Sequence, residues 1–279
     1  IDSSLVGSEM CIRDRYTFDT AGAANTNNAT YVNWVWHCNA GTTTSVNEDG
    51  SNPANVRQTN ATAGFSIITY TGTGSNGTIA HGLGVKPDWV IVKRLDGSGW
   101  SWYVQHAGVF SGRLGSIYLN GTAAGDDEAT HWNDTAPTSS VVTVGTTNGI
   151  NQNDGTYVMY AFAPVEGYSK FGNYTGNGAS DGTFVFTGFR PAWIMVKWTG
   201  GASSWFIHDN KRNPFNVTDD NLYPNLNAAE EAQANWKIDF LSNGFKLKPD
   251  AITNENNGNG QPYIYMAFAE APFKYSNAR

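Results

Sequence analysis

Histidine is the residue type in this chain that could most readily supply acid–base chemistry or bind a metal ion. The 279-residue sequence contains His37, His81, His106, His131 and His208. No two of them, and no histidine–cysteine pair, have the spacing of zinc ligands. His106 and His208 each follow an aromatic strand-like segment, so equivalent structural positions are the favoured interpretation. A Ser-His-Asp triad assembled in space stays open, but the residues around Ser169 lack the spacing of a nucleophile elbow. No catalytic residue is predicted.

Acidic residues could support two further kinds of chemistry, calcium binding and glycoside hydrolysis. Oxygen ligands for calcium occur in the acidic run 126–128 and in the Asn-rich segment 254–259. Neither segment has the spaced alternation of a calcium loop, and the acidic run aligns with Glu230 and Glu231 farther along the chain. A solvated segment is therefore the favoured interpretation. No two carboxylates stand out as the facing pair that glycoside hydrolysis requires. We expect no bound metal and no cofactor.

Spaced glycines at Gly72, Gly74 and Gly77 match the pattern of a dinucleotide-binding loop. That loop needs a following helix, whose N-terminus holds the pyrophosphate. The residues that follow, up to Pro87, cannot form a helix. The sequence therefore predicts a turn between two strands.

Two tryptophans are the candidates for ligand binding. Trp100 and Trp198 lie among Gly, Ser and Thr residues, outside any alternating apolar pattern. A pyranose ring has an apolar face and polar edges, so an exposed indole beside polar side chains can stack against a sugar. We predict glycan stacking at Trp100 and Trp198. The alternative is that both rings cover the end of a sandwich core.

An internal repeat defines the elements that must position these residues. The segment 70–93 recurs as 174–197, at a constant spacing of 104 residues. Trp132 and Trp236 keep that spacing. A repeat of this length corresponds to a complete small domain rather than to a solenoid unit.

The register of the repeat changes farther along the chain. Segment 148–150 matches 243–245 at a spacing of 95 residues, which predicts extra residues in the first copy. The last strand-like segments, 157–163 and 263–269, are 106 residues apart. Insertions at loops, with the strands kept in order, are typical of a duplicated domain.

Strand-forming patterns dominate both copies. Aromatic residues make up 13 % of the chain, and they stand with β-branched residues in short runs bounded by Gly, Asn, Asp and Ser. Ile264, Met266 and Phe268 alternate along one face of the closing strand. Segments 89–92 and 193–196 are apolar at every position, as expected of central strands covered on both faces. The predicted fold is all-β, with tandem jelly-roll-like β-sandwich domains formed by a duplicated unit of about 100 residues.

The second copy also holds one helix-forming segment. Residues 228–234 are rich in Ala and Glu, and Asn227 with Glu230 forms a capping-box pattern. The sequence predicts a short helix there. At the equivalent place in the first copy, Gly125 and two aspartates predict an irregular turn.

The repeat divides the chain into four segments. Residues 1–15 contain a string that matches the translation of a transposon library adapter, and we interpret them as a sequencing artefact. Residues 16–64 are interpreted as the tail of a truncated preceding repeat plus a linker, because 31–37 has the rhythm of the final strands. An unrelated aromatic strand is the alternative. Residues 65–165 and 166–279 are predicted to be two β-sandwich repeats.

Composition excludes several classes of protein. The formal net charge of −7 lacks the basic footprint of a nucleic-acid-binding protein. No apolar run reaches the length of a membrane-spanning helix, so we expect no membrane span. Cys38 is the one cysteine outside residues 1–15. Packing rather than disulfide bonds must therefore hold the fold together.

Several phrases of the sequence resemble those of a known family. The segments concerned are 81–93, 170–178, 188–193, 239–246 and 263–273. They resemble recurrent phrases of a domain family of unknown function in large virion proteins of tailed bacteriophages, especially marine phages. The resemblance covers about residues 65–275 and is weaker in the first copy, where 145–150 replaces a Leu-Ser-Asn-Gly-Phe-Lys phrase. It implies a virion context, in a tail or fibre, and supplies no catalytic residues.

The resemblance and the composition together lead to a functional expectation. We expect a non-enzymatic structural protein of a phage virion, associated with the tail or fibre and contacting the host surface. Its expected partners are other virion proteins and host surface glycans. Phage fibres are commonly trimeric, so a homotrimer is one assembly to test, and a monomer, as in a decoration or spacer module, is the alternative. Its expected location is the extracellular particle, assembled in the cytoplasm of the bacterial host. A carbohydrate-binding module and a tail-associated polysaccharide depolymerase are two alternatives, and a purely architectural spacer that binds no ligand is a third.

Overall fold

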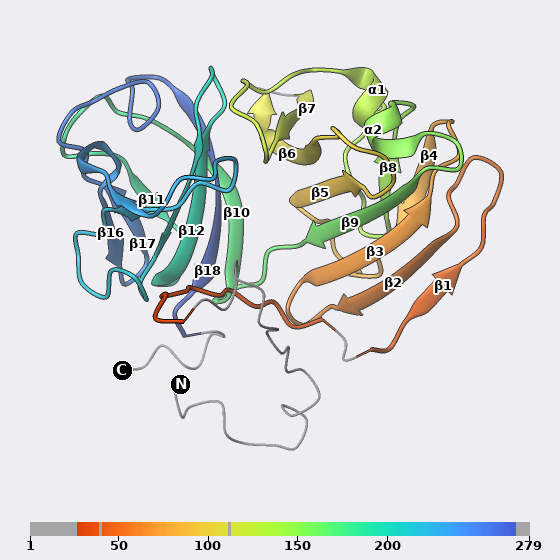
Figure 1. Cartoon of the computed structure of the whole chain (residues 1–279), viewed down its shortest axis with the longest axis horizontal. Helices are drawn as coiled ribbons and strands as arrows, with labels where there is room; N and C mark the ends of the chain where they lie inside the picture. The colour runs from red at the N-terminus through yellow and green to blue at the C-terminus, as the bar shows by residue number, and fades with distance from the viewer. Residues whose placement is uncertain (1–26, 39–40, 111–112, 272–279) are drawn as a thin grey trace.

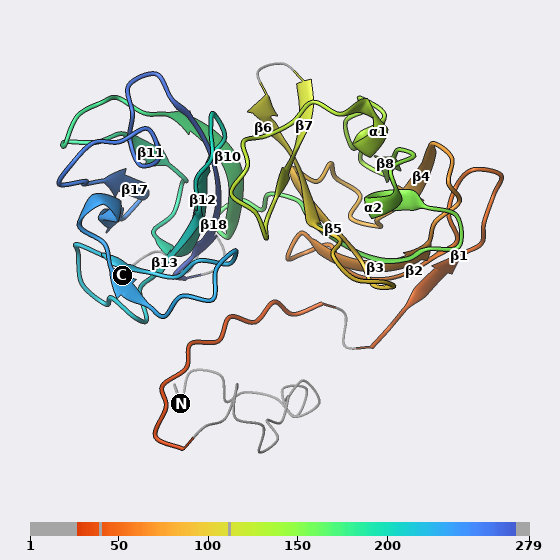
Figure 2. The same ribbon diagram turned by 45° about the horizontal axis from the view of Figure 1, so that its top comes forward.

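Antiparallel β-sheets form almost all of the regular structure of this protein (Figure 1). The structure, a computed structural model, describes residues 27–38, 41–110 and 113–271. These residues form two halves that lie side by side in Figures 1 and 2, the first coloured orange to green and the second green to blue. The prediction of an all-β fold is confirmed. The artefact predicted at residues 1–15 lies outside the described residues.

The first half is built on a seven-stranded antiparallel sheet in the order β1-β2-β3-β9-β5-β6-β7. Its strands are β1 (Thr44–Val46), β2 (Asn55–Asn60), β3 (Phe65–Thr71), β5 (Trp89–Arg94), β6 (Trp102–Phe110), β7 (Arg113–Tyr118) and β9 (Thr156–Phe162). A second layer holds the pair β4 (Gly77–Ala80) and β8 (Val141–Val144) with the short helices α1 (Ala129–Trp132) and α2 (Asn148–Asn151). The glycines at 72–77 lie in the connection from β3 to β4, which confirms the predicted turn.

The second half has a four-stranded main sheet in the order β10-β18-β12-β13. These strands are β10 (Ser169–Thr175), β12 (Pro191–Trp198), β13 (Trp205–Asp209) and β18 (Pro262–Ala269). A three-stranded sheet, in the order β11-β17-β16, contains β11 (Phe184–Phe186), β16 (Ile238–Leu241) and β17 (Gly244–Leu247). The remaining elements are β14 (Asp220–Asn221), β15 (Glu231–Ala232) and the 3₁₀ turn η3 (Ala234–Trp236).

The two halves share one topology, which is compatible with the predicted duplication. The order β3-β9-β5-β6 in the first half matches β10-β18-β12-β13 in the second, and β4-β8 matches β11-β17. This strand order shows that the sequence alignment of 148–150 with 243–245 is wrong. Strand β17 takes the place of β8, whereas residues 148–150 belong to α2. Val142 and Val144 therefore fill the first half as Phe245 and Leu247 fill the second, at a spacing of 103 residues. Compared with the spacing of 104 at Trp132 and Trp236, the first copy has only one extra residue before this strand.

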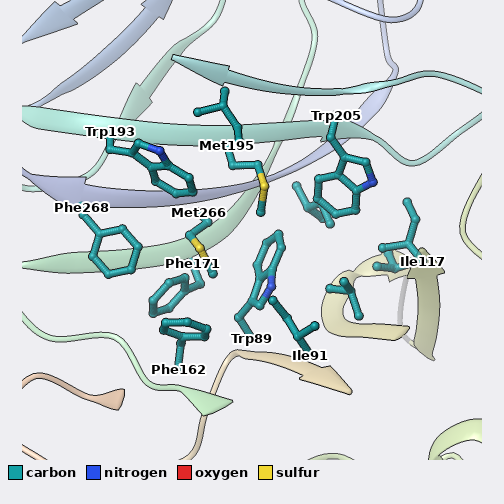
Figure 3. Close-up of a cluster of buried hydrophobic side chains, with 14 of the residues drawn as sticks. Trp89, Ile91, Ile117, Phe162, Phe171, Trp193, Met195, Trp205, Met266 and Phe268 are labelled. Carbon is teal, nitrogen blue, oxygen red and sulfur yellow. The ribbon is translucent and has the colours of Figure 1, made fainter. Parts of the chain in front are cut away.

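A single apolar core lies between the main sheets of the two halves (Figure 3). We call it the central core. Its buried members are Phe65, Trp89, Ile91, Val104, Val109, Ile117, Phe162, Phe171, Trp193, Met195, Trp205, Ile207, Ile264, Met266 and Phe268. In Figure 3, Trp193, Met195 and Trp205 extend from strands of the second half toward Trp89 and Phe162 of the first. The central core therefore joins the halves into one packed body.

The alternation of side chains along each strand explains this arrangement. Trp89 and Ile91 face the central core, whereas Val90 and Val92 face the inner core of the first half. In the second half, Ile264, Met266 and Phe268 share the central face, as the sequence predicts. Both faces of the continuously apolar segments 89–92 and 193–196 are thus covered by another layer, as the sequence predicts.

Close approach of the two main sheets requires a glycine at one point on β6. A Cβ atom added to Gly108 would lie 2.8 Å from the Cβ atom of Asn173 on β10. Contacts at that distance do not occur between real side chains, so a larger residue would push the halves apart. Gly108 therefore sets how closely the sheets pack here.

The segment before β1 is extended but pairs with no strand of the described sheets. Trp34 and Trp36 are half-buried, and their rings lie 6.1 and 5.7 Å from the ring of Trp193 at the margin of the central core. Residues 46–64, predicted as a linker, contain β2, which pairs along its whole length with β3. The seven-stranded sheet therefore includes residues that the repeat alone does not predict.

The predicted helix over 228–234 is wrong. Glu231 and Ala232 form β15 instead, and the Tyr223 hydroxyl donates to the Glu231 carboxylate over 2.6 Å. The side chains of Glu230 and Glu231 contact Arg212 and Tyr223, and these contacts outweigh the weak helix propensity of a short segment. In the first half, Gly125 and the two aspartates lie outside any helix, as the sequence predicts, and α1 begins after them at Ala129, where the second half has η3. Within the described ranges, no helix is long and apolar enough to cross a bilayer.

The central core leads to a prediction about stability. Trp205 is fully buried, and its indole Nε1 donates to the Tyr118 carbonyl oxygen across the two halves over 2.9 Å. We expect Trp205→Ala to lower the free energy of unfolding by about 3–5 kcal/mol and to shift a single transition shared by both halves. Urea unfolding followed by circular dichroism measures this, with the exposed Phe215→Ala as control. Two separate transitions, with one unaffected by Trp205→Ala, would contradict it.

Candidate functional site

The two predicted sugar-stacking tryptophans lie in different halves, and each ring already has a partner on one face. The guanidinium of Arg94 lies 4.6 Å from the centre of the Trp100 ring. Trp198 is half-buried against the inner core of the second half, and its Nε1 donates to Gln261 over 3.1 Å. A Cβ atom on Gly201 would lie 2.3 Å from this ring, so the backbone of Gly201 covers it. Glycan stacking at Trp100 and Trp198 stays a prediction.

His106 and His208 do not occupy equivalent positions. His106 lies opposite Trp89, whereas Asp209 rather than His208 lies opposite the equivalent Trp193. A shift of one residue in a strand moves a side chain to the other face. His208 is fully buried, and neither ring nitrogen has a hydrogen-bond partner in the described part of the chain. Burial lowers the pKa of His208 to about 3 and that of His106 to about 4, so both are neutral at pH 7.

One Ser-His-Asp cluster does form, around a histidine that the sequence does not single out. Nδ1 of His131 lies 2.8 Å from Oγ of Ser116 and 3.4 Å from Oδ1 of Asp126. A triad needs serine and aspartate on opposite ring nitrogens, whereas here both meet the same one. Ser116 is fully buried and also accepts a hydrogen bond from the Trp132 indole over 2.7 Å. The cluster therefore holds α1 against β7 and is not arranged for nucleophilic attack.

The side chains that could bind a metal ion lie apart from one another. Within the described residues, no group of three or more His, Cys, Asp or Glu side chains is placed to hold a metal ion. Asp126, from the acidic run considered for calcium, instead binds the Tyr118 hydroxyl as well as His131.

Lys197 is the most unusual charged residue of the junction between the halves. Its side chain is fully buried on the central face of β12, and Nζ donates to the Thr122 carbonyl oxygen of the first half over 3.3 Å. Burial lowers the pKa of Lys197 to about 8, and attraction from Glu255 offsets part of this effect. A buried ammonium group without a carboxylate partner is costly. Because Lys197 lies between the halves, its ionisation makes the stability of their packing depend on pH.

An open groove of about 410 Å³ lies at the end of the seven-stranded sheet. We call it the sheet-end groove. Strands β1, β2 and β3 and the ends of β5 and β9 form it, and Val46, Val56, Thr69, Thr71, Leu95 and Thr156 are among the residues that line it. Figures 1 and 2 show β1 and β2 on the side of the first half that faces away from the second. Strands β1 and β2 lie within residues 16–64, predicted as the tail of a truncated repeat plus a linker, so the sequence gives no sign of the groove.

An ion pair fixes the rim of the sheet-end groove. The guanidinium of Arg94 donates to the Asp96 carboxylate over 2.6 Å, and this bond holds the pKa of Asp96 well below its usual range. Asp96 Oδ1 also accepts from the backbone N–H of Thr156 over 2.8 Å. The loop after β5 and the start of β9 are thereby tied together beside the groove. Neither charged side chain lines the groove itself.

The fold and these sites describe an all-β protein of layered antiparallel sheets in which two halves share one core. A family described as a domain of unknown function, DUF7483, matches residues 11–272, and the chain belongs to this family. Both halves fall within that single match, in agreement with their shared core. No curated protein and no solved structure matches the chain.

The burial of Lys197 leads to a prediction about pH. Because folding lowers its pKa to about 8, the unfolded chain holds this proton up to about pH 10.4 while the folded chain releases it earlier. The free energy of unfolding should therefore rise by up to about 3 kcal/mol between these pH values. Lys197→Met should remove this rise and be more stable at pH 7, as measured by urea unfolding. The exposed Lys211→Met is the control, and an unchanged slope in Lys197→Met would refute the expectation.

Proposed function

We propose that this chain is a non-enzymatic structural protein of a phage virion, associated with the tail or fibre, which contacts the host surface. The observation that carries this proposal is the central core. It joins both halves into one body, which suits a protein that must keep its shape outside the cell. The resemblance to phage virion proteins supplies the context. The expected location is the particle, assembled in the bacterial cytoplasm.

The burial and the contacts of the side chains that could take part in catalysis also support a non-enzymatic role. Ser116 and His208 are buried and have no access to a substrate. Glu231 and Asp126, two of the acidic residues considered for catalysis or calcium binding, form structural contacts. The one large opening described above, the sheet-end groove, has no carboxylate, imidazole or amine in its lining, and burial raises the pKa of its two tyrosines, Tyr70 and Tyr157, so the lining offers no group that titrates near pH 7. General acid–base catalysis needs such a group within reach of the substrate.

A carbohydrate-binding module is the second candidate, and the sheet-end groove favours it. The polar, uncharged lining of that groove suits recognition without cleavage. A polysaccharide depolymerase needs two carboxylates facing one another. The sheet-end groove provides none.

Two measurements test the proposal. Mass spectrometry of purified particles, from a phage that encodes this chain, should detect its peptides at a stoichiometry expected of a tail or fibre component. Light scattering of the chain in solution should give the mass of a homotrimer, and a monomer would indicate a decoration or spacer role. The control is a lysate from which particles have been removed. Exclusion of the chain from particles, or release of reducing ends from host polysaccharide, would overturn the proposal.

A further inference from the structure

The sheet-end groove belongs to the first half alone. Toward the sheet edge, strand β3 is followed by β2 and then by β1. The equivalent strand of the second half, β10, is the last strand of its sheet. One face of β3 carries Phe65, Thr69 and Thr71. Phe65 is buried in the central core, whereas Thr69 and Thr71 are exposed. The groove is therefore the part of the central face that the second half does not cover.

The lining of the groove carries no charge and combines hydroxyl and amide groups with apolar side chains. Its polar groups come from Ser45, Asn47, Thr69, Thr71 and Thr156, and its apolar surface comes from Val46, Val56 and Leu95. The hydroxyl groups of Tyr70 and Tyr157 lie on the opposite face of the sheet, where they donate to carbonyl oxygens of α2. Phosphate, sulfate and carboxylate ligands are typically bound by Arg or Lys. Uncharged donors and acceptors beside aliphatic groups instead match a neutral polyhydroxylated ligand.

A row of side chains extends the groove across the sheet. Val56, Thr69, Val158, Lys93 and Trp102 lie opposite one another on five neighbouring strands. Lys93 is the one cation of this row, and its Nζ donates to the Trp100 carbonyl oxygen and lies 5.9 Å from the centre of the Trp102 ring. Four strand spacings of about 4.8 Å make this row about 19 Å long. At its far end the half-buried rings of Trp102 and Tyr160 are stacked, with an angle of 15° between their planes. The row suits an elongated ligand better than a single sugar.

We propose that the sheet-end groove binds a neutral oligosaccharide, which lies across the strands from β2 toward the paired rings of Trp102 and Tyr160. This inference rests on the proposed function, in which the chain contacts the host surface. It places the glycan site away from Trp100 and Trp198. Thr69, Thr71 and Thr156 donate and accept hydrogen bonds at the sugar edges, and Val56 and Leu95 contact the apolar faces of the rings.

The repeat offers a matched pair of variants for testing this site. Thr71 on β3 and Thr175 on β10 hold equivalent positions, and both are exposed, but only Thr71 borders the groove. Thr71→Arg fills the groove with a bulky cation, whereas Thr175→Arg makes the same change outside the groove. Thr71→Val removes one hydroxyl group and keeps the shape. Thermal unfolding of each variant shows that the fold is intact.

The experiment measures binding of fluorescent hexasaccharides to the full chain by anisotropy. The neutral probes are derived from dextran, mannan, galactan and xylan, and the anionic probes from alginate and hyaluronate. We expect at least one neutral probe to bind with a dissociation constant in the millimolar range or below. Thr71→Val should weaken this binding about five- to tenfold, Thr71→Arg should abolish it, and Thr175→Arg should leave it unchanged.

Several outcomes would overturn the inference. They are binding of no neutral probe, equal binding of anionic probes, wild-type binding by Thr71→Arg, or loss of binding in Thr175→Arg. Loss of binding only in Trp198→Ala would move the site to the second half. These results are independent of the particle experiment. A chain present in particles that binds no neutral glycan defeats this inference alone, and a chain that binds glycan but is absent from particles defeats the proposed function alone.

Discussion

Face-to-face packing of the two main sheets is the constraint on which the rest of this structure depends. A strand places successive side chains on opposite faces, so a strand that is apolar at every position needs a cover on both sides. In each half, one cover is the half's own second layer, and the other is the main sheet of the opposite half. Burial of the large rings of Trp89, Trp205 and Phe162 makes this contact part of the folded core.

Local patterns in the sequence account for the features that depend on strand periodicity. The alternation of Ile264, Met266 and Phe268 predicts one shared face, and these side chains do meet the central core. The repeat predicts two similar units, and their strand orders agree. Features that depend on distant partners are not predictable in this way. Strand β2 is polar and exists because it pairs with β3, and β15 replaces a predicted helix because Tyr223 and Asp220 engage its residues.

The candidate site shows the same division. Loop composition selects Trp100 and Trp198, but composition does not reveal that Arg94 and Gly201 lie against their rings. The sheet-end groove combines three consecutive strands, β1 to β3, with the ends of β5 and β9 from farther along the chain, and its threonines resemble those of any exposed strand. What distinguishes Thr71 from Thr175 is the presence of two extra strands beside it. That difference lies in the topology and not in the repeated residues themselves.

The shared central core also limits how this architecture can grow. Over the central core each half covers the other, so a third half added by the same contact would find these faces occupied. A half taken alone would expose Trp89 and Phe162, or Trp193 and Met266, to water. Loss or addition of a single half by this contact would therefore leave one apolar face uncovered.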